Sequence, residues 1–193
     1  MADDRWLVVG LGNPEAEYGG TRHNVGADVI RRLAAQEHTE LSRNKRVRSE
    51  LAEVRFAGAR VVLGVPQSYM NTSGGPVQAA AAWYKVGPER LIVCHDDLDL
   101  EVGELRVKRG GGNAGHKGLA DIDRAIGTRD YLRVRIGVGR PPGRMPAKDH
   151  VLRRFPPAER EAIDVAIAEA TDAVAALIAD GLEPTQNRYH RRS

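Results

Sequence analysis

The chain has 193 residues, which fits one domain at roughly 150 residues per domain, and its 41% apolar and 28% charged residues exclude fibrous and wholly disordered classes. A single cysteine, Cys94, excludes an internal disulfide and a cysteine-rich zinc site, and no apolar run approaches the roughly 18 residues of a membrane-spanning helix. The net charge of +3 is unevenly distributed along the chain. Residues 105–154 contain thirteen Lys or Arg and four Asp or Glu and so carry +9, whereas the other 143 residues carry −6. This asymmetry indicates either a polyanion partner or a solvated basic surface.

The first third of the chain predicts strands around one helix. Residues 6–12 form an apolar run without polar alternation, which is typical of a central strand buried on both faces. Apolar residues recur at helical spacing over 25–37, which predicts an amphipathic helix. Residues 38–50 are polar and basic and predict a loop. Residues 51–57 and 60–66 flank a glycine-containing turn, which predicts an antiparallel hairpin.

The middle of the chain alternates helices and strands. An alanine run predicts a helix over 75–84, and residues 91–94 predict another short buried strand. Residues 104–108 alternate as in a strand and lead into a glycine cluster, after which a helix is predicted over 117–126. Residues 131–138 alternate again, with aliphatic side chains on one face and two arginines on the other.

The last part of the chain predicts a loop, a long helix and a tail. Residues 140–148 are rich in proline and predict a loop, and residues 157–180 predict an amphipathic helix that ends at Gly181. Residues 186–193 predict a basic, flexible tail. Helices between strands, together with a hairpin, indicate an α/β fold: one globular domain over residues 1–185, with a mixed twisted β-sheet flanked by α-helices.

Five polar or glycine-rich segments follow predicted strands or precede predicted helices. They are Gly10-Leu-Gly-Asn-Pro14, Tyr18-Gly-Gly-Thr-Arg-His-Asn-Val-Gly26, Ser68-Tyr-Met-Asn-Thr-Ser-Gly74, His95-Asp-Asp-Leu-Asp-Leu100 and Gly110-Gly-Gly-Asn-Ala-Gly-His-Lys-Gly118. His23 precedes a helix among polar neighbours, a position suited to acid–base chemistry because its unperturbed pKa is near ~6.5. An aspartate at a strand end, such as Asp96, can orient a histidine and stabilise its cation.

Other interpretations of these segments stay open on local sequence alone. Hydrogen-bonding or capping roles explain Thr21, His23 and Asn24 equally well, and His95 with the following aspartates could bind a metal ion. The first glycine segment lacks the third glycine of a dinucleotide fingerprint, whereas residues 110–115 match that pattern formally and could instead be a flexible loop. A nucleotide-binding enzyme and a non-catalytic RNA-binding module are therefore two functions that these segments leave open.

Taken together, the five segments resemble the bacterial-type peptidyl-tRNA hydrolase family in order and spacing, from Trp6 to about His190. The resemblance implies a monomeric cytoplasmic enzyme without a cofactor or metal, which cleaves the ester between a peptide and the 3′ ribose of tRNA. It implies no membrane association and no obligate protein partner. The N-terminal residues agree with the expected cytoplasmic location. Two acidic residues, Asp3 and Asp4, precede the first apolar run, and this charge is opposite to that of a signal peptide.

The resemblance also assigns roles to residues. It implies that His23 is catalytic, that Asp96 orients it and that Asn13 discriminates blocked from free aminoacyl groups. The remaining positions implied to bind substrate or tRNA are Tyr18, Tyr69, Asn71, Lys117, Lys108 and Arg135. Among these, Lys108 and Arg135 correspond to the residues that clamp the 5′ phosphate of tRNA. Lys117 departs from the family, which usually has asparagine there, and it could contact a phosphate instead.

The residues themselves fit the same chemistry. His23 with Asp96 behind it can activate a water molecule, and the side-chain amide of Asn71 is a candidate donor to the oxyanion. No serine or cysteine lies in a recognisable nucleophile elbow, so we expect direct attack by water rather than an acyl-enzyme.

Overall fold

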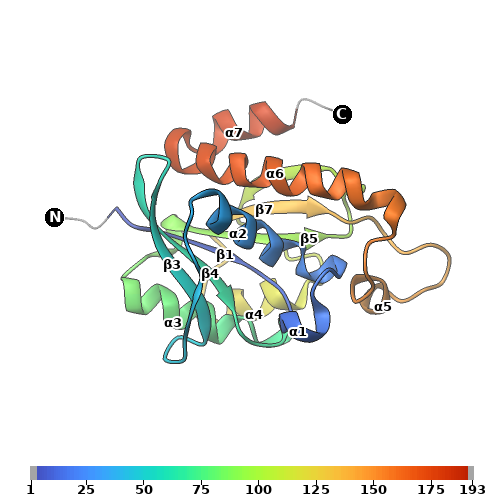
Figure 1. Cartoon of the computed structure of the whole chain (residues 1–193), viewed down its shortest axis with the longest axis horizontal. Coiled ribbons are helices and arrows are strands. Elements are labelled where there is room, and N and C mark those ends of the chain that lie inside the picture. Colours follow the sequence, from blue (N-terminus) through green and yellow to red (C-terminus); the bar gives the residue numbers. More distant parts are fainter. Residues whose placement is uncertain (1–3, 191–193) are drawn as a thin grey trace.

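The computed structural model describes residues 4–190, and in this part of the chain seven strands form one sheet (Figure 1). The strands are β1 (Trp6–Gly10), β2 (Ser42–Asn44), β3 (Ser49–Phe56), β4 (Ala59–Pro66), β5 (Leu91–Asp97), β6 (Leu105–Arg109) and β7 (Leu132–Gly137). Their order across the sheet is β2-β3-β4-β1-β5-β7-β6. The four central strands run parallel, whereas β2, β3 and β6 are antiparallel to their neighbours. The predicted mixed sheet is therefore confirmed.

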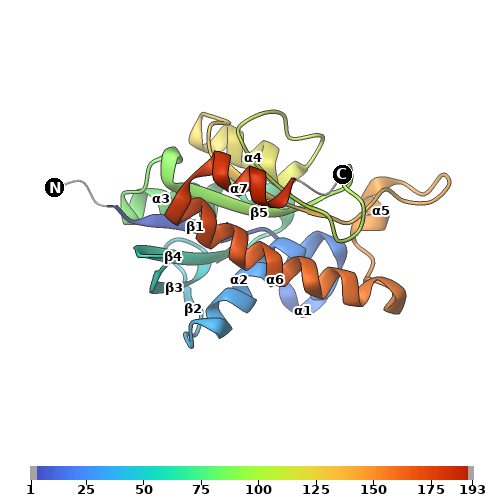
Figure 2. The same cartoon turned by 90° about the horizontal axis from the view of Figure 1, so that it is seen from above.

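Helices cover both faces of this sheet. The α-helices are α1 (Glu15–Tyr18), α2 (Val25–Gln36), α3 (Gly74–Tyr84), α4 (Lys117–Ile126), α5 (Ala147–Val151), α6 (Pro157–Asp180) and α7 (Leu182–Tyr189). Three short 3₁₀ helices are η1 (Arg22–Asn24), η2 (Met70–Thr72) and η3 (Pro88–Arg90). Figure 1 shows α6 and α7 on one side of the sheet and α3 and α4 on the other, and Figure 2 shows α6 running along the molecule from above. Within residues 4–190, none of the helices has the length and apolar content that a membrane crossing needs.

The sheet has a hydrophobic core on each face, because successive side chains of a strand point to opposite sides. Val8 and Ile92 pack with apolar residues of α2 and α6, while Leu7 and Val93 pack with those of α3 and α4. All seven residues of β5 are buried. The prediction of central strands buried on both faces is thus confirmed for β1 and β5.

Two glycines let α2 approach the ends of the central strands. A Cβ atom on Gly26 would lie 2.2 Å from the carbonyl oxygen of Cys94, and one on Gly10 would lie 2.1 Å from the carbonyl oxygen of Gly26. Only glycine fits at such distances. Because η1 directly precedes α2, this close contact also brings His23 to the end of β5.

Two predicted loops contain regular structure. Residues 42–44 of the predicted loop 38–50 form β2, which pairs with β3, and α5 begins at residue 147 inside the predicted loop 140–148. Neither element is visible in the local pattern, because β2 depends on its partner strand. The end of α5 and the residues after it depend on Arg22, whose Nη1 donates to the carbonyl oxygens of His150, Arg153 and Arg154 at 3.3–3.4 Å.

The predicted flexible tail is wrong for residues 186–189, which belong to α7. Gln186 donates to the carbonyl oxygen of Val107 at 3.2 Å, and His190 Nε2 accepts from the Val107 amide at 3.0 Å. Tyr189 packs against the core on the α6 side of the sheet. These contacts tie α7 to the edge strand β6, which local sequence could not predict. Residues 191–193 of the predicted tail lie outside the described residues.

Candidate active site

The polar segments of the sequence meet at the carboxyl edge of the central strands, where open α/β sheets bind ligands. Asn13 follows β1, Tyr69 and Asn71 follow β4, and Asp96 lies near the end of β5. His23 reaches the same edge from η1. The structure therefore brings these residues, predicted at strand ends and a helix start, together at one edge of the sheet.

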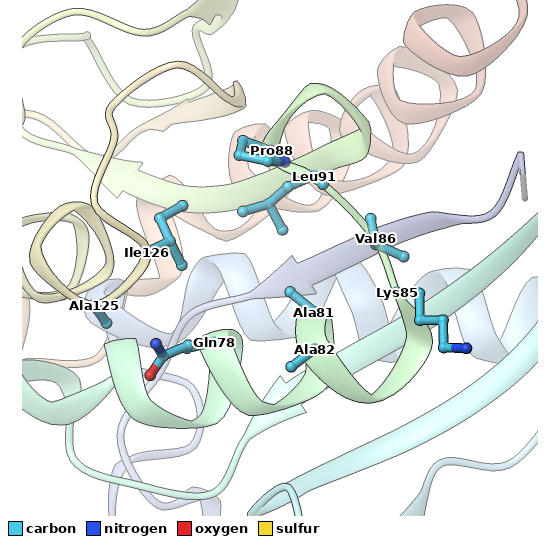
Figure 3. Close-up of a pocket in the computed structure, with 10 residues that line it drawn as sticks. Gln78, Ala81, Ala82, Lys85, Val86, Pro88, Leu91, Ala125 and Ile126 are labelled. Atoms are coloured by element: carbon cyan, nitrogen blue, oxygen red, sulfur yellow. The ribbon is translucent and has the colours of Figure 1, made fainter. Parts of the chain in front are cut away.

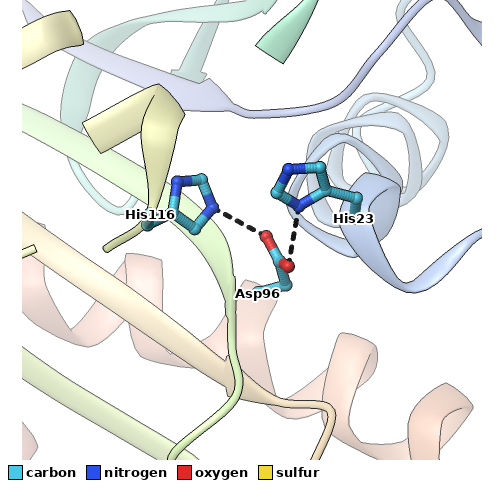
Figure 4. Close-up of side chains that lie close together, drawn as sticks. All are labelled: His23, Asp96 and His116. Carbon is cyan, nitrogen blue, oxygen red and sulfur yellow. Dashed lines mark hydrogen bonds and ion pairs between the residues drawn. The ribbon is translucent and has the colours of Figure 1, made fainter. Parts of the chain in front are cut away.

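His23 and Asp96 form a hydrogen-bonded pair (Figure 4). The Nδ1 atom of His23 is 2.8 Å from Oδ2 of Asp96. An ionised carboxylate only accepts hydrogen bonds, so Nδ1 carries the proton and Nε2 keeps a lone pair. The His23 side chain is 14% exposed and that of Asp96 is 2% exposed. The pair thus presents one basic nitrogen that solvent can reach, supported by a buried charge.

The electrostatics of the pair favour an ionised aspartate and a basic histidine. Burial alone would raise the pKa of Asp96, but the charges of His23 and His116 and the hydrogen bonds from both hold it well below its usual range. Burial lowers the pKa of His23, whereas the charge of Asp96 and its hydrogen bond outweigh this and raise the pKa above 6.5. The positive charge of Lys117 opposes that rise.

A second histidine binds the other oxygen of Asp96. His116 Nε2 lies 2.8 Å from Asp96 Oδ1 (Figure 4). His116 is also the N-cap of α4, where its Nδ1 accepts from the Leu119 amide at 3.3 Å. Because Nδ1 accepts, the proton of the neutral ring is on Nε2, which donates to Asp96. Sequence analysis missed this role, although the Gly-His segment at the start of a predicted helix was the available signal.

His95 lies beside this cluster but is buried, so it does not reach the part of the site that is open to solvent. Its Nδ1 donates to the backbone carbonyl oxygen of Asp96 at 2.7 Å, and its Nε2 is buried without a partner among residues 4–190. Burial lowers the pKa of His95 to about 3, so its ring stays neutral. Among the described residues, the group that could hold a metal ion consists of His23, Asp96 and His116, so the alternative of a metal site built on His95 and the aspartates after it is not supported.

Asn13 is held in one orientation by its neighbours. Its Oδ1 accepts from the Met70 amide at 2.7 Å, and its backbone N–H and C=O bond to the side chain of Asn24 at 2.9 and 3.0 Å. With Oδ1 occupied, the Nδ2 donor makes no hydrogen bond within the described part of the chain. Asn24 therefore has the structural hydrogen-bonding role that local sequence also allowed for it. Asn13 keeps its Nδ2 donor available for a ligand.

Two tyrosines and an asparagine lie at the same edge of the sheet as the pair. The rings of Tyr18 and Tyr69 pack edge to face with centroids 6.3 Å apart, and Tyr69 remains 54% exposed. Asn71, in η2, is exposed. These side chains can therefore meet a ligand without first breaking contacts inside the protein.

His23, Asp96 and His116 also have the composition of a metal site. Their candidate ligand atoms lie within 4.8 Å of one another. A metal ion would have to replace the protons that both histidines now donate to Asp96. For His116 this would move the remaining proton to Nδ1, which faces the Leu119 amide and would oppose it. The hydrogen-bond network thus fits a proton-transfer site better than a metal site.

The predicted phosphate-binding residues lie on β6 and β7. Lys108 is directly opposite Arg133, and Arg106 is opposite Arg135, so all four side chains share one face of the sheet. Arg135 Nε bonds to Asp97 Oδ2 at 2.9 Å, and Lys108 Nζ bonds to the Gly112 carbonyl oxygen at 3.2 Å. Burial, Arg135 and Arg133 lower the pKa of Lys108. An anion bound there would relieve this repulsion.

A cavity of about 400 Å³ lies at the opposite edge of the sheet (Figure 3). Alanine and larger aliphatic side chains from α3, α4 and the start of β5 line most of it. It contains none of the predicted site residues, and its two long polar side chains are Gln78 and Lys85. Its lining gives no reason to place the chemistry there.

Comparisons with known proteins all name one family. A family model described as Peptidyl-tRNA hydrolase matches residues 7–193. The peptidyl-tRNA hydrolase of Frankia alni is 55% identical over 188 residues, which cover 97% of this chain and 95% of the relative. That of Rhodococcus erythropolis is 48% identical over 190 residues, covering 98% of this chain and 100% of the relative. The crystal structure of peptidyl-tRNA hydrolase from Acinetobacter baumannii is similar with a TM-score of 0.91 at 34% identity, covering 99% of this chain and 97% of that one.

Proposed function

The chain belongs to the peptidyl-tRNA hydrolase family, and from this premise we propose that His23 activates the water molecule that cleaves peptidyl-tRNA. The observation that carries the proposal is the hydrogen bond from His23 Nδ1 to Asp96, which leaves the lone pair on Nε2. In this scheme Nε2 removes a proton from water while the water oxygen attacks the ester carbonyl. Asp96 stabilises the imidazolium that results.

The rest of the reaction uses donors that the free protein leaves available. The oxyanion of the tetrahedral intermediate accepts a hydrogen bond from the exposed Asn71 amide. Collapse of the intermediate breaks the bond to the ribose oxygen, which receives the proton from His23. The products are a peptide carboxylate and a tRNA with a free hydroxyl. No protein–peptide bond forms, so a covalent peptidyl-enzyme trapped by mass spectrometry would contradict this scheme.

The side chain of Asn13 explains how the enzyme would distinguish blocked from free aminoacyl groups. Its Nδ2 is a donor, and it fits the carbonyl oxygen of an N-acyl group or peptide bond. A free α-amino group is an ammonium that offers only donors, so it would repel Nδ2. We assign peptide recognition to Asn13 with Tyr18 and Tyr69 beside it. We also propose that the enzyme acts as a monomer in the cytoplasm, where peptidyl-tRNA is produced.

The first test compares two substrates under metal-free conditions. We expect the purified protein to cleave N-acetyl-aminoacyl-tRNA in the presence of EDTA and to leave free aminoacyl-tRNA intact over the same period. Release of labelled aminoacyl groups measures both reactions. Loss of activity in EDTA that zinc restores would instead support a metal site on His23, Asp96 and His116. Binding of tRNA without cleavage of either substrate would support the non-catalytic RNA-binding alternative.

Replacing Lys108 or Arg135 by alanine should weaken binding of the tRNA phosphate. We expect KM to rise and the slope of log(kcat/KM) against log[salt] to fall by about one for each lost phosphate contact. Arg55, an exposed arginine of β3, provides a matched control, because Arg55→Ala removes the same charge from the far hairpin. An unchanged salt slope in Lys108→Ala and Arg135→Ala would rule out this assignment.

Lys117 should tune the pH dependence of the reaction. Its positive charge lowers the pKa of His23, so Lys117→Asn should raise that pKa. Because the base must be unprotonated, activity increases with pH through this pKa, and the acidic limb of kcat/KM should move to higher pH. The control is Lys85→Asn, since Lys85 lies at the opposite edge in a left-handed conformation that asparagine tolerates. A limb that moves equally in both variants would indicate a general charge effect.

A further inference from the structure

Arg133 is a fully buried arginine of β7, on the face of the sheet that also carries Arg135 of β7 and Lys108 of β6. Its Nη2 lies 3.4 Å from Asp123 Oδ1, and its guanidinium lies over the Tyr131 ring at 4.6 Å from the centroid. The Tyr131 hydroxyl donates to the same Asp123 oxygen at 2.7 Å. These contacts fix Arg133 in place, whereas Lys108 is only half-buried.

Arg133 and Lys108 hold the same backbone carbonyl. Arg133 Nη1 donates to the Gly112 oxygen at 2.9 Å, and Lys108 Nζ donates to it at 3.2 Å. A carbonyl oxygen has two lone pairs, so this one is saturated. Gly110, Gly111 and Gly115 have positive φ angles, and glycines give this segment little stiffness of its own. Its position therefore depends on the two anchors.

A short chain of contacts joins Gly112 to the catalytic pair. The next residue, Asn113, accepts from the backbone amide of His116 at 2.9 Å and from that of Gly115 at 3.0 Å. His116 in turn donates to Asp96, the partner of His23. A shift of the Gly112 carbonyl would thus be transmitted to the carboxylate behind the catalytic base.

We propose that Arg133 is a positioning residue, which keeps the glycine segment and His116 in place when a tRNA phosphate draws Lys108 away from Gly112. The inference rests on the proposed phosphate site at Lys108 and Arg135. A charge-assisted bond to phosphate is stronger than one to a neutral carbonyl, so Lys108 leaves Gly112 when phosphate binds. Arg133 cannot follow, because Asp123 and Tyr131 hold it under the surface.

The test is a comparison of two substrates that differ in one phosphate. N-acetyl-aminoacyl-tRNA is prepared with its 5′ phosphate and after phosphatase treatment. Arg133→Lys keeps the charge but lacks the fork that reaches both Gly112 and Asp123. We expect its kcat to fall about ten-fold on the phosphorylated tRNA, the size of one hydrogen bond to a charged group. The loss should be several-fold smaller without the phosphate, because Lys108 then still holds Gly112.

Two further variants separate positioning from stability. Arg133→Gln combined with Asp123→Asn avoids a buried unpaired charge and should show the same dependence on phosphate. Tyr131→Phe removes a hydroxyl from the same cluster but keeps the ring beneath Arg133 and the bond from Arg133 to Gly112, so its kcat relative to the wild type should be the same on both substrates. Equal losses of kcat on both substrates, or a change in KM alone, would overturn the inference. A wild-type enzyme that cleaves both substrates with equal kcat/KM would overturn the phosphate site and the inference with it, although hydrolysis itself would stand.

Discussion

His23→Ala is expected to lose hydrolysis of N-acetyl-aminoacyl-tRNA almost completely, with kcat lower by about 10³-fold and the dissociation constant for tRNA within about two-fold. The variant removes the nitrogen that takes the proton from water in the proposed mechanism, whereas the cations on β6 and β7 stay intact. Alanine also leaves Asp96 with one histidine partner instead of two. The effect should therefore appear in kcat rather than in tRNA affinity. Single-turnover hydrolysis and filter binding measure the two quantities separately.

His38→Asn is the matched control for this variant. His38 is an exposed histidine after α2 with a positive φ angle, a conformation that asparagine tolerates. It should cleave the substrate like the unmodified protein. If His23→Ala retained more than about a tenth of the wild-type kcat, general-base catalysis by His23 would be untenable, because such catalysis contributes at least ~10²-fold.

Much of the fold can be predicted because short-range patterns determine it. The helix over residues 157–180 is predicted with its observed bounds, since proline starts it, glycine ends it at Gly181 and apolar residues recur between them. The central strands are predicted because both of their faces are apolar. The tail and β2 could not be predicted, because contacts with β6 and β3 stabilise them and no local pattern records those contacts.

The candidate site also contains some residues that local sequence predicts and others that depend on contacts between distant parts of the chain. His23 and Asp96 follow from their positions at a helix start and a strand end, which place both at one edge of the sheet. His116 and Arg133 do not. His116 acts through a bond to Asp96, which is twenty residues away in sequence. Arg133 alternates with aliphatic neighbours, a pattern typical of a solvated position, yet Asp123 and Tyr131 bury it. Local sequence identifies which side chains can react, and only the packing identifies which ones hold them in place.

Asp96→Asn should lower kcat by roughly 10³-fold, because an amide cannot satisfy both histidines. Both rings donate to the carboxylate, but an amide offers one acceptor and one donor group. The Leu119 amide keeps the His116 proton on Nε2, so the asparagine oxygen will face His116. Its NH₂ group then faces His23 and forces the proton of that ring onto Nε2. His23 is left in the tautomer that cannot accept a proton from water.

This argument makes a rescue possible. His116→Ser retains a residue suited to the N-cap of α4 but removes the competing donor to position 96. In the Asp96→Asn background it should recover about ten-fold in kcat, because the asparagine oxygen can then turn to His23, and one hydrogen bond is worth about that factor. Without the carboxylate charge the pKa of His23 falls, so the acidic limb of kcat/KM should lie at lower pH than in the wild type. Asp99→Asn, which changes an exposed carboxylate in the same segment, should alter neither quantity. Additive losses in the double variant would show that the tautomer of His23 does not limit the reaction.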